Sequence, residues 1–384
     1  MTKKAIFIGP AYPYRGGIAA FNENLASSFQ NNGWTCKIFT FTQQYPNFLF
    51  PGKNQLSTDD SAPNLNIKRA IYSTNPLNWL KITKEIVALE PDLMIVQYWM
   101  PFMAPAFGTI LRGVKKGYDK VFNVTVVHNF KPHESLIGDK QLGRFIASRT
   151  DLMVALSDNV AGDIKNAVPD KAVSRLFHPI YDHYGIKISQ REAQEKLDLE
   201  PGYKYLLFFG LVRNYKGLDL LLDALALLKS DTRYRLIIAG EFYESEKKYL
   251  KQIEDLGISE QLIINNEYIL NDAVPHYFCA SDIVVLPYRR ATQSGVVPIA
   301  LHFEKPIIAT DVGDFGNMIR DKKIGLIASP EPESIADKID RFLDGQEFEL
   351  DQFKSVKQSL SWQSFFNNFT TEIEKNGFGH QGTD

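Results

Sequence analysis

The 384-residue sequence has few cysteines, no excess charge of one sign and no long hydrophobic run. Its only two cysteines, Cys36 and Cys279, lie far apart in apolar segments, which excludes a disulfide framework and a cysteine-rich zinc site. Lysine and arginine number 43 against 45 aspartate and glutamate residues, a net charge of −2, which excludes a bulk polyanion binder such as a nucleic-acid-binding protein. Any phosphate or membrane contact must therefore come from a local basic cluster.

The sequence also offers no segment that would export the chain or hold it across a membrane. No uncharged apolar run approaches the roughly 18 residues of a spanning helix, and the first apolar stretch, Ala5–Ile8, is too short for a signal peptide. We therefore expect a cytoplasmic protein, with peripheral attachment at the inner membrane face left open. Lys115, Lys116, Tyr118 and Lys120 form one basic and aromatic cluster that suits an anionic surface, although solvated charge is the commoner role of such residues.

Two common signatures of phosphate and metal binding are missing as well. No Walker A sequence and no Asp-x-Asp pair occur in the chain. Asp-x-Asp is the simplest clamp for a divalent metal on a nucleotide diphosphate, and His128 and His133 have no evident third ligand beside them. The sequence therefore predicts neither a metal ion nor a bound cofactor, because basic residues can neutralise a diphosphate in place of a metal.

What the sequence does contain is a regular alternation of short apolar runs and amphipathic stretches. Most of the runs are rich in Val, Ile, Leu and Phe without alternation, as expected for strands of parallel sheets that helices cover on both faces. The predicted strands of the first half are Ala5–Ile8, Cys36–Phe41, Leu93–Gln97, Val121–Val127, Leu152–Ala155 and Ser174–Phe177, and those of the second half are Tyr205–Phe209, Leu236–Ala239, Leu262–Ile264, Ile283–Leu286, Pro306–Ala309 and Gly325–Ala328.

The pattern restarts once, near Phe177–Leu199. Each half opens with an apolar strand that ends in glycine, followed by a polar loop with a basic residue and an amphipathic helix. We therefore predict two doubly wound, Rossmann-like α/β domains, residues 1–180 and 181–360, facing each other across a cleft. Residues 361–384 add a final helix and a tail, and in that helix Trp362, Phe365, Phe366 and Phe369 form a docking stripe. The segment Pro46–Asn66 is predicted to be a mobile loop or insertion.

Two loops at the carboxyl ends of predicted strands carry features that suit phosphate, and ligands of open parallel sheets bind at this edge. The first loop ends in Gly16 and Gly17, before a helix that begins near Ile18, and lacks the G-x-G-x-x-G dinucleotide fingerprint. Its backbone amides are suited to bind an anion. A loop whose backbone requires positive φ angles would explain the two glycines equally well. The second loop carries Arg213 and Lys216, two cations that suit a diphosphate; the alternative is two ordinary surface charges.

A third loop and a histidine complete the candidate residues. Thr292, Ser294 and Gly295 supply hydroxyls and free amides before a helix that extends to Phe303, although Ser294 is equally suited to be a simple N-cap. His128 follows the predicted strand Val121–Val127 and suits hydrogen bonding or acid–base chemistry, with a buried, satisfied histidine as the alternative. Arg15, Arg289 and Arg290 lie in the same predicted set of loops.

The order of these segments resembles the retaining GT-B glycosyltransferases of family 4, also called glycosyl transferases group 1. The resemblance covers essentially the whole chain and is clearest at Phe208–Ala224, Leu236–Glu241 and Ser281–Gly313. It implies a nucleotide-diphosphate sugar donor held mainly by the second domain, a glycan or glycolipid acceptor on the first, and retention of anomeric configuration. It further implies that the final helix crosses back onto the first domain.

The resemblance also implies a role for each candidate residue. Arg213 and Lys216 would hold the donor diphosphate and His128 would lie beside the donor sugar as catalytic residues. The family's remaining donor contacts would fall on the backbone or hydroxyls of Gly16, Gly17, Tyr268, Ile269, Thr292, Ser294, Gly295 and Val296.

The chain departs from this family's pattern at one place. The family commonly carries Glu-x7-Glu within the stretch that corresponds to Ala291–Ala300, where this chain has no carboxylate, and Glu304 comes too late for the spacing. The sequence resembles a subgroup with Thr-Gln-Ser-Gly-Val here, in which Thr292 or Gln293 would replace the glutamate. We expect a hexosyltransferase-type enzyme of polysaccharide or glycoconjugate biosynthesis, with a nucleotide-sugar epimerase or hydrolase and a degenerate nucleotide-binding protein as alternatives.

Overall fold

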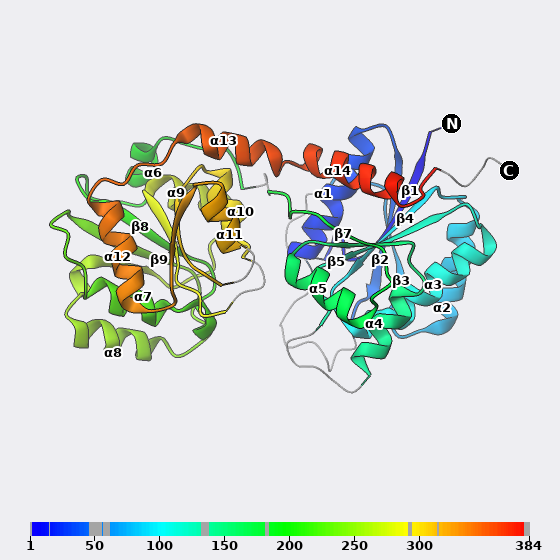
Figure 1. Cartoon of the computed structure of the whole chain (residues 1–384), viewed down its shortest axis with the longest axis horizontal. Coiled ribbons are helices and arrows are strands. Elements are labelled where there is room, and N and C mark those ends of the chain that lie inside the picture. Colours follow the sequence, from blue (N-terminus) through cyan, green and yellow to red (C-terminus); the bar gives the residue numbers. More distant parts are fainter. Residues whose placement is uncertain are drawn as a thin grey trace. The chain divides into compact units, whose positions relative to one another are not determined.

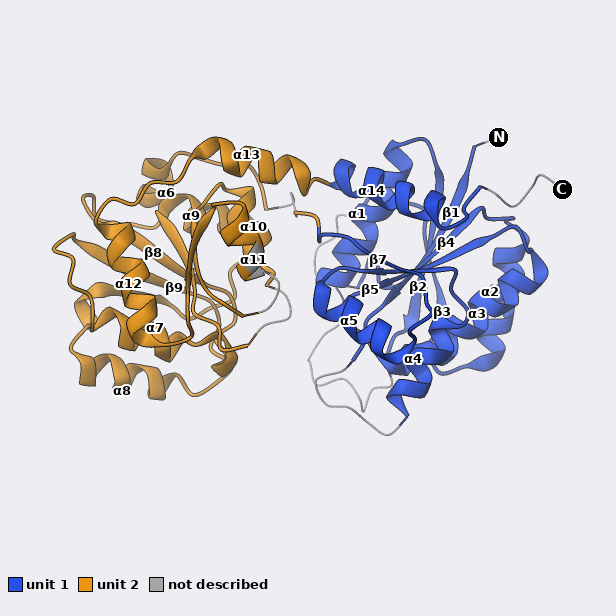
Figure 2. Ribbon diagram, viewed as in Figure 1, with its two compact units in different colours: residues 1–178, 362–384 blue, residues 179–361 orange. Residues whose placement is uncertain are grey.

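The computed structural model describes residues 2–14, 16–45, 56, 62–131, 138–180, 184–290, 294–312 and 315–379. The chain divides into two compact units, which Figure 2 colours separately. Unit 1 comprises Met1–His178 and Trp362–Asp384, and unit 2 comprises Pro179–Ser361. The sequence had placed these divisions after residues 180 and 360, whereas the structure divides the chain after residues 178 and 361.

Unit 1 is built on a seven-stranded sheet in the order β3-β2-β1-β4-β5-β6-β7, and every pair of neighbours is parallel. The strands are β1 (Lys4–Ile8), β2 (Thr35–Gln43), β3 (Ile67–Tyr72), β4 (Leu93–Tyr98), β5 (Phe122–Val127), β6 (Leu152–Ala155) and β7 (Val173–Arg175). The helices are α1 (Gly17–Asn31), α2 (Pro76–Val87), α3 (Ala104–Gly117), α4 (Asp139–Ala147), α5 (Asp158–Ala167) and α14 (Trp362–Lys375), and Figure 1 shows them around the sheet.

Both faces of this sheet are buried, which explains why its strands read as continuous apolar runs. In β1, Ala5 and Phe7 pack into the core under α1 and α14, whereas Ile6 and Ile8 pack into the core under α2, α3, α4 and α5. Because successive side chains of a strand point to opposite faces, a strand covered by helices on both sides must be apolar at every position. The predicted α/β class is confirmed in unit 1.

The sequence prediction missed one strand of unit 1. No strand was predicted at β3, since it is an edge strand whose residues Lys68 and Arg69 are exposed. A strand at the edge of a sheet is half-solvated, so it lacks the continuous apolar run that marked the others. The predicted loop Pro46–Asn66 lies mostly outside the described residues.

The last helix, α14, belongs to unit 1 although it follows unit 2 in the chain. Its aromatic stripe packs edge-on against α1. The Phe29 ring centroid lies 4.9 Å from that of Phe366, and the Phe21 centroid lies 5.2 Å from Trp362 and 5.7 Å from Phe365. Edge-to-face aromatic pairs of this kind add stabilisation beyond the area they bury. The stripe is therefore core of unit 1.

Unit 2 repeats the architecture with a six-stranded parallel sheet in the order β10-β9-β8-β11-β12-β13. All six strands predicted for the second half of the chain occur, as β8 (Lys204–Phe209), β9 (Tyr234–Ala239), β10 (Leu262–Asn265), β11 (Ile283–Leu286), β12 (Ile307–Thr310) and β13 (Gly325–Ala328). The helices are α6 (Gln190–Lys196), α7 (Leu218–Leu225), α8 (Glu246–Leu256), α9 (Val274–Ala280), α10 (Val296–His302), α11 (Phe315–Asp321), α12 (Pro332–Leu343) and α13 (Leu350–Ser359).

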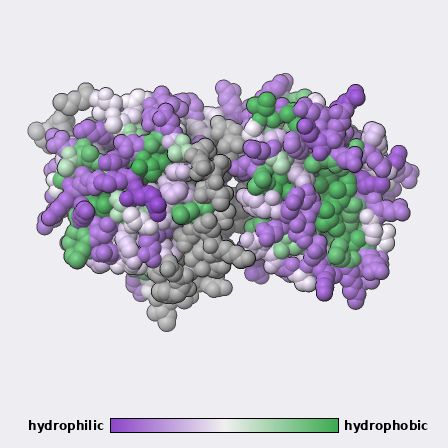
Figure 3. Space-filling model, turned by 180° about the vertical axis from the view of Figure 1, so that it is seen from behind, coloured by the Kyte–Doolittle hydropathy of each residue, from purple (hydrophilic) through white to green (hydrophobic). Residues whose placement is uncertain are grey.

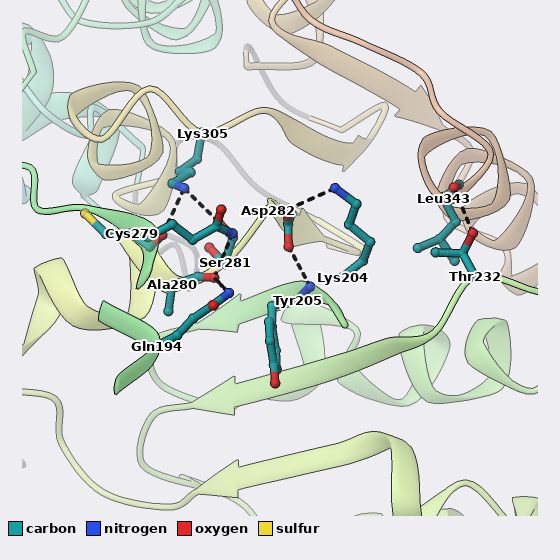
Figure 4. Close-up of polar contacts among 11 residues, drawn as sticks. Gln194, Lys204, Tyr205, Thr232, Cys279, Ala280, Ser281, Asp282, Lys305 and Leu343 are labelled. Carbon is teal, nitrogen blue, oxygen red and sulfur yellow. Dashed lines mark hydrogen bonds and ion pairs between the residues drawn. The ribbon is translucent and has the colours of Figure 1, made fainter. Parts of the chain in front are cut away.

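Side chains form hydrogen bonds at the carboxyl end of α9 and at the start of β8 (Figure 4). Lys305 donates from Nζ to the carbonyl oxygens of Cys279 and Ser281 at 3.1 and 2.7 Å, and Gln194 donates to that of Ala280 at 3.2 Å. A cation at the carboxyl end of a helix satisfies its last carbonyl groups and suits its dipole. Lys305 is therefore a structural cap.

No helix among the described residues is long and apolar enough to cross a membrane. On the face seen in Figure 3, hydrophilic residues surround separate hydrophobic patches. The two cysteines, Cys36 and Cys279, are both buried and unpaired, as expected from their positions in apolar segments.

Candidate functional site

The order of the strands in unit 2 reverses between β8 and β11, and this switch point is where open α/β sheets bind ligands. The loops that follow β8 and β11 approach each other closely there. Gly217 has φ +70°, and a Cβ at this residue would lie 2.0 Å from the carbonyl oxygen of Pro287. The backbone amide of Arg289 donates to the carbonyl oxygen of Tyr215 at 2.8 Å. Glycine is therefore required at position 217 for the two loops to meet.

Lys216 is a buried cation at this switch point. The residue is 8 % exposed, and its Nζ lies 5.9 Å from the ring centroid of Tyr288. Burial, and to a smaller extent the neighbouring charge of Arg213, lower the pKa of Lys216 to about 8. Among the described residues no carboxylate forms an ion pair with Lys216. A buried cation without a counter-ion is costly, and an anionic ligand would supply the missing charge.

Arg213 lies on the same loop and is exposed. Its guanidinium carbon lies 4.7 Å from the centroid of the Tyr243 ring, a cation–π contact. Tyr243 follows β9, so the two residues come from neighbouring loops at the carboxyl edge of the sheet. Arg213 and Lys216, the two cations predicted to hold a diphosphate, thus lie three residues apart at the ligand edge of unit 2.

The sequence placed Arg289 in the same set of loops as these two cations, but its charge is already paired within unit 2. Its Nη1 and Nη2 donate to Oδ1 and Oδ2 of Asp219 at 2.6 and 2.7 Å, a bidentate ion pair. Burial alone would raise the pKa of Asp219, but the bonds and charge of Arg289 outweigh burial and lower it. Arg289 therefore ties the loop after β11 to α7.

A pocket of about 700 Å³ opens beside this ion pair. It is lined by Arg213, Asn214, Tyr215, Tyr243, Glu244, Arg289 and Arg290. The sequence analysis did not identify Tyr243 and Glu244, which follow Gly240 after β9. The rule that ligands bind at the carboxyl ends of strands would have found them, because β9 is the neighbour of β8. Glu244 accepts a hydrogen bond from the backbone amide of Asn214 and so fixes the loop that carries Arg213.

The third predicted loop is described from Ser294 onward, while Thr292 and Gln293 lie outside the described residues. The hydroxyl of Ser294 lies 3.3 Å from that of the buried Tyr288 and accepts a hydrogen bond from the amide of Val296 at 3.3 Å. The N-cap residue of α10 is Gly295 and not Ser294, so the predicted N-cap role of Ser294 is wrong, and Ser294 contacts only the first amide of the helix. A Cβ at Gly295 would meet nothing within 4 Å, so no steric conflict requires glycine there.

The remaining candidates of unit 2 follow β10 and α10. Tyr268 is 64 % exposed and Ile269 is 9 % exposed, in the loop that follows β10 at the same edge of the sheet. Glu304 accepts a hydrogen bond from Nζ of Lys187 at 2.5 Å. Burial tends to raise the pKa of Glu304, but the bond and charge of Lys187 outweigh burial and lower it. Glu304 is therefore engaged in a structural ion pair.

The ligand edge of unit 1 contains the other predicted glycine loop. Gly16 has φ +115°, a backbone conformation that favours glycine, and Gly17 begins the 15-residue helix α1. No side chain of the N-cap residue closes the amino end of α1. Arg15 lies outside the described residues. Gly16 thus serves the turn, which is one of the two predicted roles of this loop.

His128 follows β5 at the same edge and is partly exposed. Its Nε2 lies 2.8 Å from Oε1 of Gln97, and the Phe21 ring lies edge-on to the imidazole at 4.9 Å between centroids. The surrounding apolar groups, and then the charge of the neighbouring His178, lower the pKa of His128 to about 3. The imidazole is therefore neutral at physiological pH.

Among the described residues, no group of three or more His, Cys, Asp and Glu side chains is placed to hold a metal ion. His133 lies outside those residues. The aromatic residues Trp79 and Tyr98 are 9 % and 0 % exposed and belong to the core of unit 1.

Comparison with known proteins finds similarity to glycosyltransferases. Residues 189–358 match the family described as glycosyl transferases group 1. A lipopolysaccharide core biosynthesis mannosyltransferase, LpsB of Rhizobium meliloti, is 29 % identical over 215 residues, which cover 52 % of this chain and 58 % of LpsB. The match thus spans little more than half the length of that relative. An uncharacterised glycosyltransferase of Methanocaldococcus jannaschii is 24 % identical over 369 residues, 92 % of each chain.

Solved structures resemble the chain over nearly its whole length. The structure of HepE from Anabaena in complex with UDP has a TM-score of 0.72 at 15 % identity, covering 97 % of this chain and 100 % of HepE. The two parallel-sheet, Rossmann-like units match those of GT-B glycosyltransferase structures. The chain therefore has the two-unit GT-B fold, and its residues 189–358 match the glycosyl transferases group 1.

Proposed function

We propose that the protein transfers a hexosyl group from a nucleotide-diphosphate sugar to a glycan or glycolipid acceptor, with retention of anomeric configuration, in polysaccharide or glycoconjugate biosynthesis. The observation that carries the proposal is Lys216. It is a buried cation with no carboxylate partner among the described residues, three residues from Arg213 at the switch point of unit 2. Two cations at this edge suit a diphosphate better than a single phosphate or a neutral sugar.

The same two cations supply what the chemistry needs. When the glycosidic bond to the donor breaks, negative charge develops on the leaving diphosphate, and preorganised positive charge stabilises that charge. The planar guanidinium of Arg213 can donate two parallel hydrogen bonds to phosphate oxygens, while Lys216 acts as a point charge. Retention is consistent with a leaving phosphate that accepts the proton of the incoming acceptor hydroxyl, as the family resemblance implies. We propose that this neutralisation proceeds without a metal ion.

The remaining contacts extend the donor site. We propose that the exposed Tyr268 and the backbone of Ile269 meet the nucleotide base, and that Thr292, Ser294, Gly295 and Val296 contact the diphosphate from the loop after β11. Gly16 and Gly17, at the start of α1, would contact a phosphate of the donor. His128 would contact the donor sugar. The similarity to the lipopolysaccharide mannosyltransferase LpsB supports a lipid-linked acceptor.

A binding screen followed by a transfer assay tests the proposal. Nucleoside diphosphates should raise the melting temperature of the protein, because a ligand that binds only the native state stabilises it. The nucleotide that binds should then identify the donor, and transfer to an acceptor should leave the anomeric configuration unchanged. Release of free sugar or an epimer from the donor alone would favour a hydrolase or epimerase. Tight binding without turnover on any acceptor would favour a degenerate nucleotide-binding protein.

Nucleoside diphosphate affinity should depend on pH through Lys216. The pKa of about 8 in the free protein means that Lys216 is protonated at pH 7 and loses its charge above pH 8. A bound diphosphate favours the protonated form, so affinity should fall above pH 8 by up to about tenfold per pH unit. Calorimetry at several pH values measures this. Lys216→Arg keeps its charge and should abolish the fall; a fall of the same size in that variant would assign it to another group.

We further propose that the exposed face of α2 and α3 in unit 1 contacts an anionic lipid surface. Leu77 and Leu80 of α2 are 78 % and 53 % exposed, and Lys81 and Lys84 are exposed beside them. The neighbouring α3 adds exposed basic residues, and Lys120 follows it. Lys115 is less available, because its Nζ donates to the carbonyl oxygen of Val121 at 2.6 Å. Exposed leucines beside lysines suit a membrane interface that carries negative charge.

Vesicle flotation tests this surface. The protein should float with vesicles that contain phosphatidylglycerol, but not with neutral phosphatidylcholine vesicles, and the binding should weaken at high salt. Leu77→Ser combined with Leu80→Ser should reduce the bound fraction. Leu350→Ser in unit 2, where the leucine is 59 % exposed, should leave it unchanged. Equal binding to neutral vesicles, or equal loss in both variants, would contradict the assignment.

A further inference from the structure

A chain of buried amide side chains connects the loop after β1 to His128 in unit 1. Asn22, on α1, donates from Nδ2 to the carbonyl oxygen of Pro10 at 3.0 Å. Gln97, in β4, donates from Nε2 to Oδ1 of Asn22 at 3.2 Å. Oε1 of Gln97 lies 2.8 Å from Nε2 of His128. Four segments that are far apart in the sequence therefore meet in one hydrogen-bonded line.

The direction of every bond in this line follows from its first member. The carbonyl oxygen of Pro10 can only accept, so the amide nitrogen of Asn22 must face it. Oδ1 of Asn22 then faces Gln97 and can only accept, so Gln97 must present its own amide nitrogen to Asn22. Oε1 of Gln97 is left facing His128, and an acceptor there requires a proton on Nε2 of the imidazole. One backbone carbonyl thereby fixes the tautomer of a histidine through two side chains.

Packing holds the two amides in place. Asn22 and Gln97 are both fully buried, at 0 % exposure. Gly9, at the end of β1, leaves space for Gln97, because a Cβ at residue 9 would lie 2.8 Å from Cγ and 2.9 Å from Cβ of Gln97. Two buried amides in an otherwise apolar core cost free energy unless each finds its partners. Here each amide nitrogen has an acceptor and each amide oxygen faces a donor.

We propose that Asn22 and Gln97 are positioning residues that hold His128 as the neutral Nε2–H tautomer, so that Nδ1 is the ring atom that accepts a hydrogen bond from a substrate hydroxyl. The role in the reaction rests on the proposed function, whereas the tautomer does not. Among the described residues Nδ1 has no hydrogen-bond partner, and the ring is partly exposed.

This assignment restricts what His128 contributes to transfer. A proton that Nε2 donates to a buried amide is not delivered to a leaving group, so His128 orients a sugar hydroxyl instead of acting as a general acid. The apolar contact with Phe21 and the neighbouring His178, which lies 5.1 Å from the same phenylalanine ring, disfavour an imidazolium. Arg213 and Lys216 are then the residues that stabilise the negative charge of the leaving diphosphate.

Nitrogen NMR on the full chain tests the tautomer without any activity assay. The protein has 7 histidines, so labelling histidine with ¹⁵N gives few ring signals, and the His128→Gln variant identifies those of His128. At pH 7 we expect Nε2 in the range of a protonated ring nitrogen and Nδ1 in the range of an unprotonated one. The reverse assignment, or a doubly protonated ring, would overturn the proposal whether or not the protein is a glycosyltransferase.

Variants of Gln97 and Asn22 test the relay itself. Gln97→Met keeps the packing against Gly9 but removes the acceptor for Nε2. Asn22→Leu removes the acceptor that orients the Gln97 amide, so Gln97 can rotate. In both variants His128 should no longer show only the signals of a protonated Nε2 and an unprotonated Nδ1. Gln97→Glu should keep this pattern where the carboxyl is protonated, since its hydroxyl then donates to Oδ1 of Asn22 while its carbonyl oxygen accepts from Nε2. Asn24→Leu is the control, because Asn24 on the same helix also donates to a backbone carbonyl, that of Ala20 at 2.9 Å. An unchanged tautomer in a folded Gln97→Met protein would refute the relay.

Kinetics on the donor identified by the screen then test the role in the reaction. We expect kcat to fall roughly 100-fold in Gln97→Met, the loss typical of a misplaced catalytic contact, with the donor KM changed less than about twofold. Gln97→Glu should recover most of kcat. A normal kcat in Gln97→Met despite a changed tautomer would overturn the role of Nδ1. Absence of transfer in the unmodified protein would instead count against the proposed function and leave the tautomer result standing.

Discussion

A protein carrying Arg213→Ala together with Lys216→Ala should bind nucleoside diphosphates roughly 10²- to 10⁴-fold more weakly than the unmodified chain. Each charged hydrogen bond contributes about 1.5–3 kcal/mol, and two such losses correspond to this range of dissociation constants. The variant should nevertheless fold, because Arg213 is exposed and removal of the buried Lys216 charge relieves a desolvation cost. Isothermal titration calorimetry measures the affinity.

The matched control removes the same charge elsewhere on unit 2. Arg191→Ala combined with Lys196→Ala changes two exposed cations of α6, and nucleotide affinity should stay within about twofold. If the two double variants lose affinity equally, the effect is one of net charge, and the switch point of unit 2 is not the diphosphate site. An unchanged affinity in the Arg213 and Lys216 variant would likewise refute the assignment.

Gly217→Ala should destabilise unit 2 far more than Gly257→Ala does. Both glycines have nearly the same left-handed backbone, with φ +70° and ψ 31° at Gly217 and φ +66° and ψ 26° at Gly257. A Cβ at Gly257 meets nothing within 4 Å, whereas one at Gly217 would lie 2.0 Å from the carbonyl oxygen of Pro287. Gly257→Ala should therefore cost only the backbone penalty, about 1–2 kcal/mol, while Gly217→Ala adds an overpacking cost of roughly 1–3 kcal/mol.

Urea unfolding of the two variants measures this difference, and nucleotide affinity gives a second readout. A Cβ at position 217 would push the loop after β8 away from the loop after β11. The Gly217→Ala variant should therefore also bind the diphosphate more weakly. Gly257→Ala should bind it normally. Equal losses of stability in the two variants would mean that the loops do not meet as closely as the distance to Pro287 implies.

Much of the fold was predictable because it depends on local pattern. A strand buried on both faces must be apolar throughout, so β1, β4 and β5 were visible as continuous runs in the sequence. The edge strand β3 was not visible, since only one of its six residues is fully buried and its pattern resembles that of a loop. Burial, and not propensity alone, therefore decided which strands the sequence revealed.

Part of the candidate site was predictable for a related reason. Parallel strands bring their carboxyl ends to one edge, so Arg213, Lys216 and His128 were identified from their places after strands. Their electrostatic states were not predictable. Arg289 also follows a strand, but its bidentate pair with Asp219 removes it from the cations free to bind a ligand. Asp219 is 70 residues away from Arg289 in the chain, and no local sequence pattern indicates such an ion pair.

The sequence by itself determined the α/β class, the repeat of one architecture in two halves, and the edge of each sheet where the chemistry-bearing residues lie, because these follow from the periodicity and order of apolar runs. The tertiary structure alone decided which of those residues are charged, neutral or already paired. Lys216 is buried and forms no ion pair with a carboxylate of the described residues, Arg289 is tied to Asp219, and His128 receives its tautomer from Pro10 through Asn22 and Gln97. Protonation and hydrogen-bond direction depend on neighbours in space, and folding brings those neighbours together from distant parts of the chain.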